Sequence, residues 1–193
     1  MKIQLMLMIA ALVAAGSVYA KNPVAVIKTS MGTIKCELYQ TDAPKTVKNF
    51  VGLAEKNFYD GILFHRISRG FVIQAGDPFT KDKSKMSQWG MGGESIYGGK
   101  AFEDELNANA PSYKAGYQKG VLAMANSGPN TNKSQFFILL GDQTSWMPHN
   151  YTIFGKVISG QDVVDKIGQE PIAGGQKDGR PTNDIVIQKI TIE

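Results

Sequence analysis

Three segments of this 193-residue chain hold the residue types from which a binding or catalytic site can be built. The first, FHRISRGFVIQAGD at residues 64–77, sets one arginine, Arg66, among apolar residues that alternate as in a β-strand. Residues 124–138, MANSGPNTNKSQFFI, and residues 146–154 add amides, apolar side chains and a Gly/Pro/Asn turn. None of the three supplies an activated nucleophile, paired carboxylates or a metal-binding cluster. This combination suits a substrate that is held and twisted rather than cut.

Other chemistries find little support in the residue types. The chain has only His65 and His149 and no GxSxG elbow, which argues against a Ser-His-Asp hydrolase. One cysteine and two histidines argue against a dedicated zinc site. The glycines of residues 90–99 lack the GxxxxGKS/T order of a phosphate-binding loop. We therefore expect neither a metal nor a cofactor.

Apolar alternation predicts that a mainly β fold positions these segments. Residues 24–29 and 33–39 are strand-like runs around a Ser-Met-Gly turn, which predicts a hairpin whose glycine, Gly32, takes an unusual backbone dihedral. Further strand-like runs lie at residues 58–73, 120–125, 134–140 and 186–192. Residues 77–100 form a long connection rich in Gly, Lys and Ser without periodicity, which is typical of a functional loop.

Two amphipathic helices are expected beside these strands. The first begins near Pro44 and repeats apolar residues at helical spacing on one face: Val47, Phe50, Val51 and Ala54. The second begins with a capping-box-like pair, Ser159 and Asp162, and continues with Val163, Val164 and Ile167 on one side. Many short strands and only two helices favour a closed antiparallel barrel with its ends covered by the helices.

The N-terminal residues have the pattern of a cleavable secretory signal. Lys2 precedes an apolar stretch at residues 3–13 that is too short to span a bilayer, and small residues end at Ala20. An uncleaved membrane anchor is the alternative. We expect a signal peptide at residues 1–20 and a single mature domain at residues 21–193, a length that suits one hydrophobic core.

The net charge limits the classes of binding partner, and the cysteine count decides whether a disulfide can stabilise the fold. The formal net charge of +4 is mild and no basic cluster is interleaved with aromatics, which argues against nucleic acid or an anionic membrane as the main partner. The single cysteine, Cys36, excludes an internal disulfide and lies in phase with Ile34 and Leu38. We therefore expect Cys36 to be a buried, small apolar residue.

The motifs FHRI, GFVIQAGD, GGESIYG, FEDE, MANSGPNTNKSQFFI and YTIFGKV occur in this order along the chain. In these motifs the sequence resembles the cyclophilin-type peptidyl-prolyl cis-trans isomerases, over about residues 24–193. The resemblance implies a closed eight-stranded antiparallel β-barrel capped by two α-helices, with the active site on its outer face. It also implies a monomeric enzyme that rotates X-Pro bonds of flexible or unfolded polypeptides without a cofactor.

The chemistry of the X-Pro bond explains why an arginine suits this reaction. Amide resonance sets a rotation barrier of roughly 18–20 kcal/mol, while the cis and trans forms differ by only about 0.5–1 kcal/mol. Twisting the amide localises a lone pair on the prolyl nitrogen, so a donor beside that nitrogen stabilises the twisted state more than either planar state. A guanidinium stays charged and presents several fixed donors. Arg66 is therefore the candidate catalytic residue.

The resemblance also implies a set of substrate-binding residues. Phe71, Met124 and Phe137 match the positions that build the proline pocket, with Tyr151 at its rim, while Gln74 and the backbone of Asn126 hold substrate carbonyls. Trp146 matches the tryptophan associated with cyclosporin binding, which predicts that cyclosporin-type cyclic peptides bind. The complete set is Phe71, Val72, Gln74, Met124, Ala125, Asn126, Gln135, Phe137, Trp146, Met147 and Tyr151.

Two features depart from the family pattern. Tyr151 stands where many members have a histidine, and we do not transfer that role to His149, two residues earlier. Residues 81–89 look like extra sequence beside the outer part of the groove. Four lysines of this region favour acidic residues upstream of the proline, or else simply keep the loop solvated: Lys81, Lys83, Lys85 and Lys100.

A second function class also agrees with the sequence. A binding module or chaperone of the same fold holds unfolded exported proteins in the groove without any need for catalysis. Arg66 discriminates between the two classes, because a pure binder has no use for a cation beside the prolyl nitrogen. The signal pattern places either activity in a periplasm, with secretion from the cell as the alternative.

Overall fold

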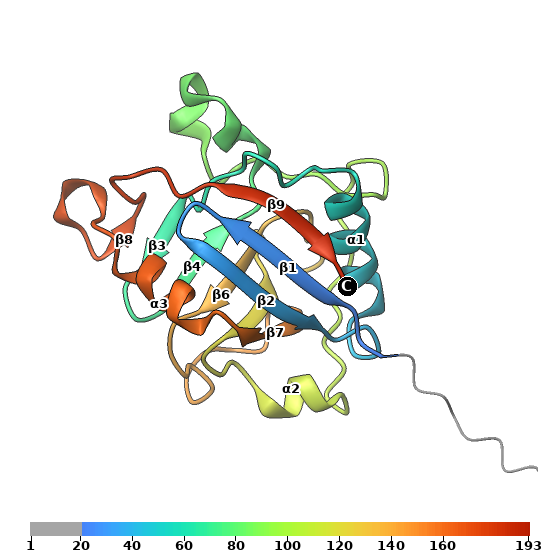
Figure 1. The fold of residues 1–193 in the computed structure, drawn as a ribbon. Helices are drawn as coiled ribbons and strands as arrows, with labels where there is room; N and C mark the ends of the chain where they lie inside the picture. The colour runs from blue at the N-terminus through green and yellow to red at the C-terminus, as the bar shows by residue number, and fades with distance from the viewer. Residues whose placement is uncertain (1–20) are drawn as a thin grey trace, which may run out of the picture.

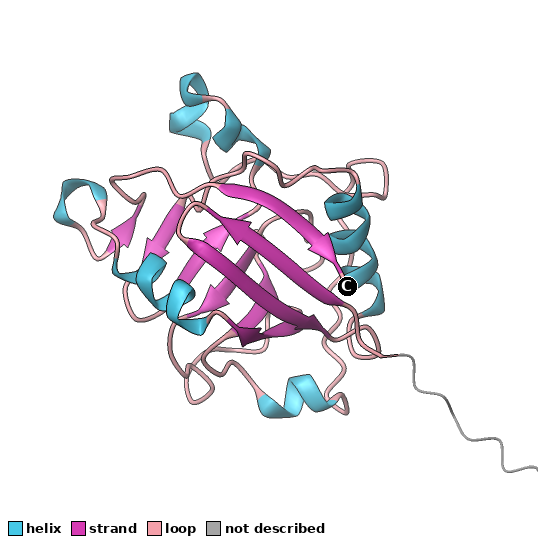
Figure 2. Cartoon of the chain, in the orientation of Figure 1, coloured by secondary structure: helices cyan, strands magenta, loops and turns pink. Residues whose placement is uncertain are grey.

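The computed structural model describes residues 21–193, so the expected signal peptide at residues 1–20 lies outside the described residues. This part of the chain folds into a strongly curled antiparallel sheet with helices at its margins (Figures 1 and 2). The strands are β1 (Val24–Thr29), β2 (Gly32–Leu38), β3 (Arg66–Ser68), β4 (Val72–Ala75), β5 (Val121–Met124), β6 (Phe136–Leu139), β7 (Ile153–Ser159), β8 (Asp178–Gly179) and β9 (Ile187–Ile192). The α-helices are α1 (Pro44–Glu55), α2 (Pro111–Ala115) and α3 (Gln161–Gln169).

The sheet is an open half-barrel, with strand order β8-β3-β4-β6-β5-β7-β2-β1-β9. The prediction of a closed eight-stranded barrel is therefore wrong in strand number and in closure. Leu63, just before β3, forms a single bridge to Val186, just before β9. A few backbone hydrogen bonds flank this bridge, from Phe64 N–H to the Ile185 carbonyl at 2.9 Å and from Ile187 N–H to the Ile62 carbonyl at 2.8 Å, but β3 and β9 form no continuous ladder.

The first hairpin and the first helix form where the sequence predicts them. β1 and β2 pair antiparallel, and Gly32 between them has a φ of 138°. α1 begins at Pro44 and buries the face that carries Val47 and Phe50. The short helix α2 was not predicted.

The predicted capping box of the second helix is wrong. Ser159 ends strand β7, and α3 begins after Gly160, whose φ of 82° is in the left-handed region and which gives the helix no side-chain cap. An added Cβ at Gly160 would lie 2.2 Å from the carbonyl oxygen of Thr33. The close approach of β2 thus requires glycine at position 160, and this glycine is the N-cap residue instead of the predicted Ser159.

The connection after β4 is helical in part rather than irregular. It forms two 3-10 helices, Pro78–Lys81 and Lys83–Gln88, which project beyond the end of the sheet as a separate lobe (Figure 1). Asp77 and Asp82 cap these turns by accepting hydrogen bonds from the backbone N–H of Phe79 and Ser84. Such caps stabilise short helical turns. Each 3-10 helix is too short to repeat apolar residues along one face, so the sequence shows no helical periodicity here.

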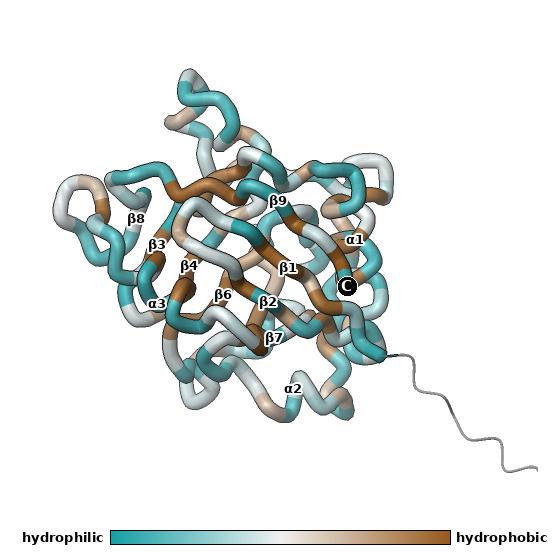
Figure 3. The backbone as a smooth tube through the Cα atoms, viewed as in Figure 1, coloured by the Kyte–Doolittle hydropathy of each residue, from teal (hydrophilic) through white to brown (hydrophobic). Residues whose placement is uncertain are grey.

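Hydrophobic stretches run along the strands of the sheet (Figure 3), and their alternating side chains form two apolar layers, one on each face. The interior layer packs α1 against the concave face and contains the aromatic cluster Phe50, Tyr59, Phe136 and Phe154. Cys36 is fully buried in it, as predicted, and burial raises the pKa of its thiol. The outer layer gathers Val72, Val121, Ala123, Phe137, Leu139 and Ile153 with Tyr117 and Met147.

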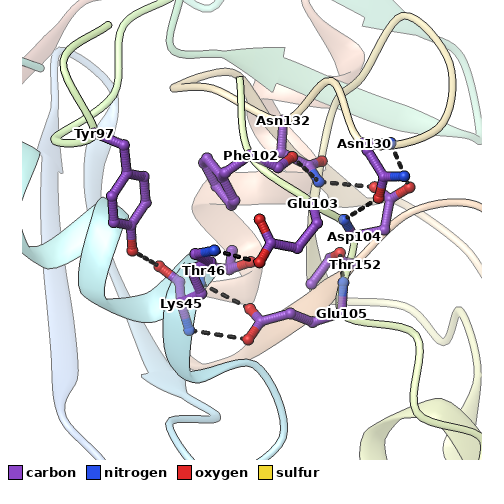
Figure 4. A network of polar contacts seen from close by, with 10 residues as sticks. All are labelled: Lys45, Thr46, Tyr97, Phe102, Glu103, Asp104, Glu105, Asn130, Asn132 and Thr152. Atoms are coloured by element: carbon purple, nitrogen blue, oxygen red, sulfur yellow. Dashed lines mark hydrogen bonds and ion pairs between the residues drawn. The ribbon is translucent and has the colours of Figure 1, made fainter. Parts of the chain in front are cut away.

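The FEDE segment ties α1 to the loops around the outer face (Figure 4). Glu105 accepts hydrogen bonds from the backbone N–H of Lys45 at 3.0 Å and of Thr46 at 2.8 Å. Asp104 accepts from the backbone N–H of Asn130 at 2.8 Å and from the side-chain amide of Asn132 at 2.7 Å. The motif thus caps the first turn of α1 and fixes the loop between β5 and β6.

Glu105→Ala is expected to lower the free energy of unfolding by about 1–2 kcal/mol, because it frees two backbone donors at the start of α1. Ala43, at the N-cap position, has no side chain that can replace them. Urea unfolding followed by circular dichroism measures the change. Glu103→Ala is the matched control, since Glu103 only pairs with exposed Lys45 and its loss should change stability little. Equal effects of the two substitutions would contradict the capping role.

Candidate active site

A cavity of about 480 Å³ opens on the outer face of the sheet, over β3, β4 and β6. Strands position its floor, since β4 and β6 pair antiparallel and present alternate side chains outward. Nine of the twelve residues predicted for the site line the cavity: Arg66, Phe71, Val72, Gln74, Ala125, Asn126, Phe137, Met147 and Tyr151.

Arg66 lies at the cavity wall, directly opposite Gln74 in the pairing of β3 with β4. Its Nη1 donates to Gln74 Oε1 at 3.1 Å, and Gln74 Nε2 donates to Gln135 Oε1 at 2.9 Å. Gln135 Nε2 in turn donates to the carbonyl oxygens of Gly90 at 2.8 Å and Gly92 at 2.7 Å. This relay fixes the orientation of both amides and thereby one edge of the guanidinium.

Asp178 holds the other edge of the Arg66 guanidinium. The carboxylate accepts from Nε at 2.8 Å and from Nη2 at 2.6 Å, a bidentate pair whose side chains are 46% and 37% exposed. The hydrogen bond from Arg66 lowers the pKa of Asp178 below its ordinary value of 3.8. Strand β8 places this carboxylate by pairing Asp178 with Ser68. Arg66 is thus immobilised on two edges at the rim of an apolar cavity.

Aromatic and apolar side chains form the rest of the cavity. Phe137 is 4% exposed and meets the ring of Tyr151 edge-on, with centroids 5.5 Å apart. The backbone N–H of Tyr151 donates to the buried hydroxyl of Tyr117 at 3.0 Å, and that hydroxyl donates to the Tyr151 carbonyl at 2.8 Å. Buried Tyr117 therefore positions Tyr151 from behind, so the apolar wall is preformed.

Comparison with known proteins identifies the family to which this arrangement belongs. A sequence model described as "Cyclophilin type peptidyl-prolyl cis-trans isomerase/CLD" matches residues 24–192. The chain belongs to the cyclophilin-type peptidyl-prolyl isomerases. Its activity is therefore the cis-trans isomerisation of peptidyl-prolyl bonds.

Curated cyclophilins resemble this chain over nearly their whole length. Peptidyl-prolyl cis-trans isomerase-like 1 of Neurospora crassa is 45% identical over 166 residues, which cover 86% of this chain and 91% of that protein. Peptidyl-prolyl cis-trans isomerase-like 3 of Homo sapiens is 43% identical over 169 residues, which cover 86% and 93% of the two chains.

Solved cyclophilin structures share the fold. A cyclophilin-type isomerase of Cryptosporidium parvum superposes with a TM-score of 0.75 at 35% identity, covering 89% of this chain and 97% of that one. A second structure of the same protein, determined in the presence of the dipeptide Ala-Pro, gives a TM-score of 0.74.

Three residues predicted for the site of this cyclophilin lie outside the main cavity. Met124 is 1% exposed and packs in the interior layer, since it pairs with Phe136, which also faces inward. Gln135 lines an adjoining depression and reaches Arg66 only through Gln74. Trp146 is 61% exposed and contacts the cavity through the ring of Phe71, with centroids 5.5 Å apart.

The second histidine of the cyclophilin, His149, packs against Tyr113 and not in the cavity. His149 stacks on Tyr113 with ring centroids 4.0 Å apart, and its Nε2 lies 3.0 Å from the Tyr113 carbonyl oxygen. Tyr151, two residues later, lines the cavity instead. His149 therefore packs beside Tyr113 and is not among the residues that line the cavity.

Several cavity residues were not predicted from the sequence. His65 is 7% exposed, lines the cavity and finds no hydrogen-bond partner for either ring nitrogen within the described chain. Burial lowers the pKa of His65, so the imidazole is neutral at pH 7. Trp89, Gly179 and Arg180 also line the cavity, and Asp178 was missed with them. Two of them carried a signal in the sequence: His65 belongs to the FHRI motif, and Trp89 ends the extra segment at residues 81–89.

Asp178→Asn is expected to reduce kcat of this cyclophilin about two- to fivefold with little change in KM, because a neutral amide holds the guanidinium less firmly. The pKa of Asp178 is depressed, so the pair is fully formed above the ordinary value of 3.8 and is lost only as the pH falls through the lower folded value. We therefore expect no effect of this group on the rate between pH 6 and 8. Asp178→Glu should restore part of kcat, and an unchanged kcat in Asp178→Asn would contradict the positioning role.

Neither a metal-binding group nor a membrane-crossing helix is found among residues 21–193. No three His, Cys, Asp or Glu side chains in this range are grouped as ligands. None of the helices in the same range is long and apolar enough to cross a bilayer.

Proposed function

We propose that this cyclophilin rotates X-Pro bonds in the outer-face cavity, with Arg66 as the catalytic cation. The observation that carries the proposal is the fixation of Arg66 by Asp178 and Gln74 beside an apolar cavity. A pre-oriented donor stabilises the twisted amide without reorganising during the reaction, which is the condition for strong electrostatic catalysis.

The other cavity residues bind the two sides of the X-Pro bond. Phe137, Met147 and Tyr151 form an apolar surface that grips the proline ring, while Gln74 and the backbone of Asn126 hold carbonyl groups of the rotating part. The Asn126 side chain is already engaged, since its Nδ2 donates to the Asn150 carbonyl at 2.9 Å. Substrate contacts of this kind bind backbone and proline without reading most side chains.

The experiment that tests this proposal is exchange NMR on an X-Pro peptide with the mature chain from Lys21. Uncatalysed isomerisation takes roughly tens to hundreds of seconds. A catalytic amount of folded protein should make the cis-trans exchange much faster than this. Peptide binding without acceleration would instead support the chaperone that uses the same groove for holding alone.

We also propose that the enzyme works on exported polypeptides, in a periplasm or, alternatively, outside the cell. The sequence of residues 1–20 supports this placement through its charged start, apolar centre and small residues before Lys21. N-terminal sequencing of the protein isolated from its host should find Lys21 as the first residue, in an extracytoplasmic fraction. An intact Met1 in the cytoplasmic fraction would refute this placement.

Cyclosporin is expected to abolish the acceleration at saturating concentration, because Trp146 presents an exposed indole beside Phe71 at the cavity rim. The inhibition constant should rise at least tenfold in Trp146→Ala while turnover of a short peptide falls less. Titration of the exchange rate with the drug measures both quantities. Full activity of the wild type at saturating drug would contradict the prediction.

A further inference from the structure

Two segments that lie far apart in the sequence meet at one end of the cavity. Trp89 follows the second 3-10 helix, Arg180 follows β8, and the guanidinium carbon of Arg180 lies 5.9 Å from the centre of the Trp89 ring. Both residues line the cavity that also contains Arg66. This end of the cavity therefore has an aromatic and cationic wall beyond the proline-binding surface.

The backbone on both sides of this wall is well anchored. The carbonyl of Arg180 accepts a hydrogen bond from Ala173 at 2.9 Å, and Pro181 bridges to Ile172. The Trp89 indole donates to the Asp82 carbonyl at 3.3 Å. The residue after Trp89 is held as well, since the carbonyl of Gly90 accepts from Gln135 at 2.8 Å. The wall is thus preformed rather than assembled around a ligand.

The guanidinium of Arg180 has no hydrogen-bond acceptor and no carboxylate partner within residues 21–193. The two nearest acidic residues in the sequence are already engaged. Asp178 pairs with Arg66, and Asp184 pairs with Lys83 at 2.9 Å. Stacking on an aromatic ring orients an arginine while leaving its N–H groups free to donate.

The lysines of the same region do not reach the cavity. Lys81 donates to the Phe58 carbonyl at 2.8 Å, Lys83 is paired, and Lys85 lies over the Phe79 ring at 5.1 Å. None of the four lysines, Lys100 included, is among the residues that line the cavity, which favours the alternative that they keep the loop solvated. The extra segment at residues 81–89 instead places Trp89 in the cavity wall, and the Trp89 ring lies against the guanidinium of Arg180.

We propose that Arg180, backed by Trp89, forms a subsite for a carboxylate side chain of the substrate. The inference rests on the proposed function, namely that the X-Pro bond lies beside Arg66. Asp178 contacts Arg66 and lies two residues from Arg180, which is roughly 7 Å along an extended chain. Two residues of an extended peptide span a similar length, so the acidic side chain belongs within about two residues of the proline.

The test compares peptides that carry Glu, Gln or Lys two residues before the proline, and a second series with the same residues directly after it. The ratio of kcat/KM for Glu over Gln is measured by exchange NMR at low and at high salt. Wild type should prefer Glu about two- to fivefold at low salt in one of the two series, the size expected of a partly exposed ion pair, and should disfavour Lys. High salt should reduce the ratio.

Arg180→Gln should bring this ratio to about one, and Arg180→Lys should restore part of it. Lys85→Gln is the matched control, because it removes a nearby cation outside the cavity and should leave the preference unchanged. An equal Glu preference in Arg180→Gln, or none in the wild type, would overturn the subsite. Failure of the wild type to accelerate any peptide would refute the placement of the reaction in this cavity, and the subsite with it.

Discussion

Arg66→Ala is expected to lower kcat/KM for an X-Pro peptide about 100- to 1000-fold, the size measured when one oriented donor to a developing charge is removed. The loss should appear mainly in kcat, since the guanidinium stabilises the twisted amide more than the planar one. Exchange NMR on the same peptide, with wild type and variant side by side, measures the change.

Two controls make this result specific. Arg66→Lys keeps the charge but cannot form the bidentate pair with Asp178, so it should retain only a small part of the activity. Thermal unfolding of both variants should remain close to wild type, because Arg66 is 37% exposed on its side chain and its ion pair contributes little to stability. A folded Arg66→Ala variant with the wild-type rate would exclude the proposed mechanism. Retained peptide binding with lost turnover would separate catalysis from holding.

Gly76→Ala is expected to destabilise the fold by about 3–4 kcal/mol. Gly76 follows β4 with a φ of 97°, and an added Cβ would lie 2.2 Å from the backbone carbonyl oxygen of Ser134. The Ser134 hydroxyl also donates to the Gly76 carbonyl at 2.7 Å, so the two segments cannot separate without losing this bond. Urea unfolding should show a lower midpoint at an unchanged slope.

Gly70→Ala is the matched control for this prediction. Gly70 also has a positive φ, 70°, but an added Cβ there would meet no atom within 4 Å. Its substitution should therefore cost only the intrinsic strain, about 1 kcal/mol. Similar losses in the two variants would show that backbone strain, rather than the contact with Ser134, dominates at Gly76.

Local alternation predicted most strands, because a strand that covers one buried face repeats its apolar residues with period two. The hairpin of β1 and β2 and the start of α1 at Pro44 are confirmed by the structure. The cap of α3 was mispredicted since Gly160 is required by the approach of a strand more than one hundred residues earlier.

Strand parity explains why Met124 lies outside the cavity. Met124 and Phe136 face each other on the interior side, whereas Phe137, one residue on, faces the cavity. The resemblance supplied both Met124 and Phe137 as pocket residues. Alternation alone places them on opposite faces once β5 and β6 are paired, because successive side chains point to opposite sides of a sheet.

By itself, the sequence determined the fold class, the place of Arg66 on a short strand and the apolar residues around it, since all of these depend on neighbours within a few residues. Only the tertiary structure decided that the sheet is open, that Asp178 holds Arg66 across 112 residues of chain, and that Trp89 lies against Arg180. These contacts depend on the register of the two-residue strand β8 against β3, and no local pattern encodes so short a pairing.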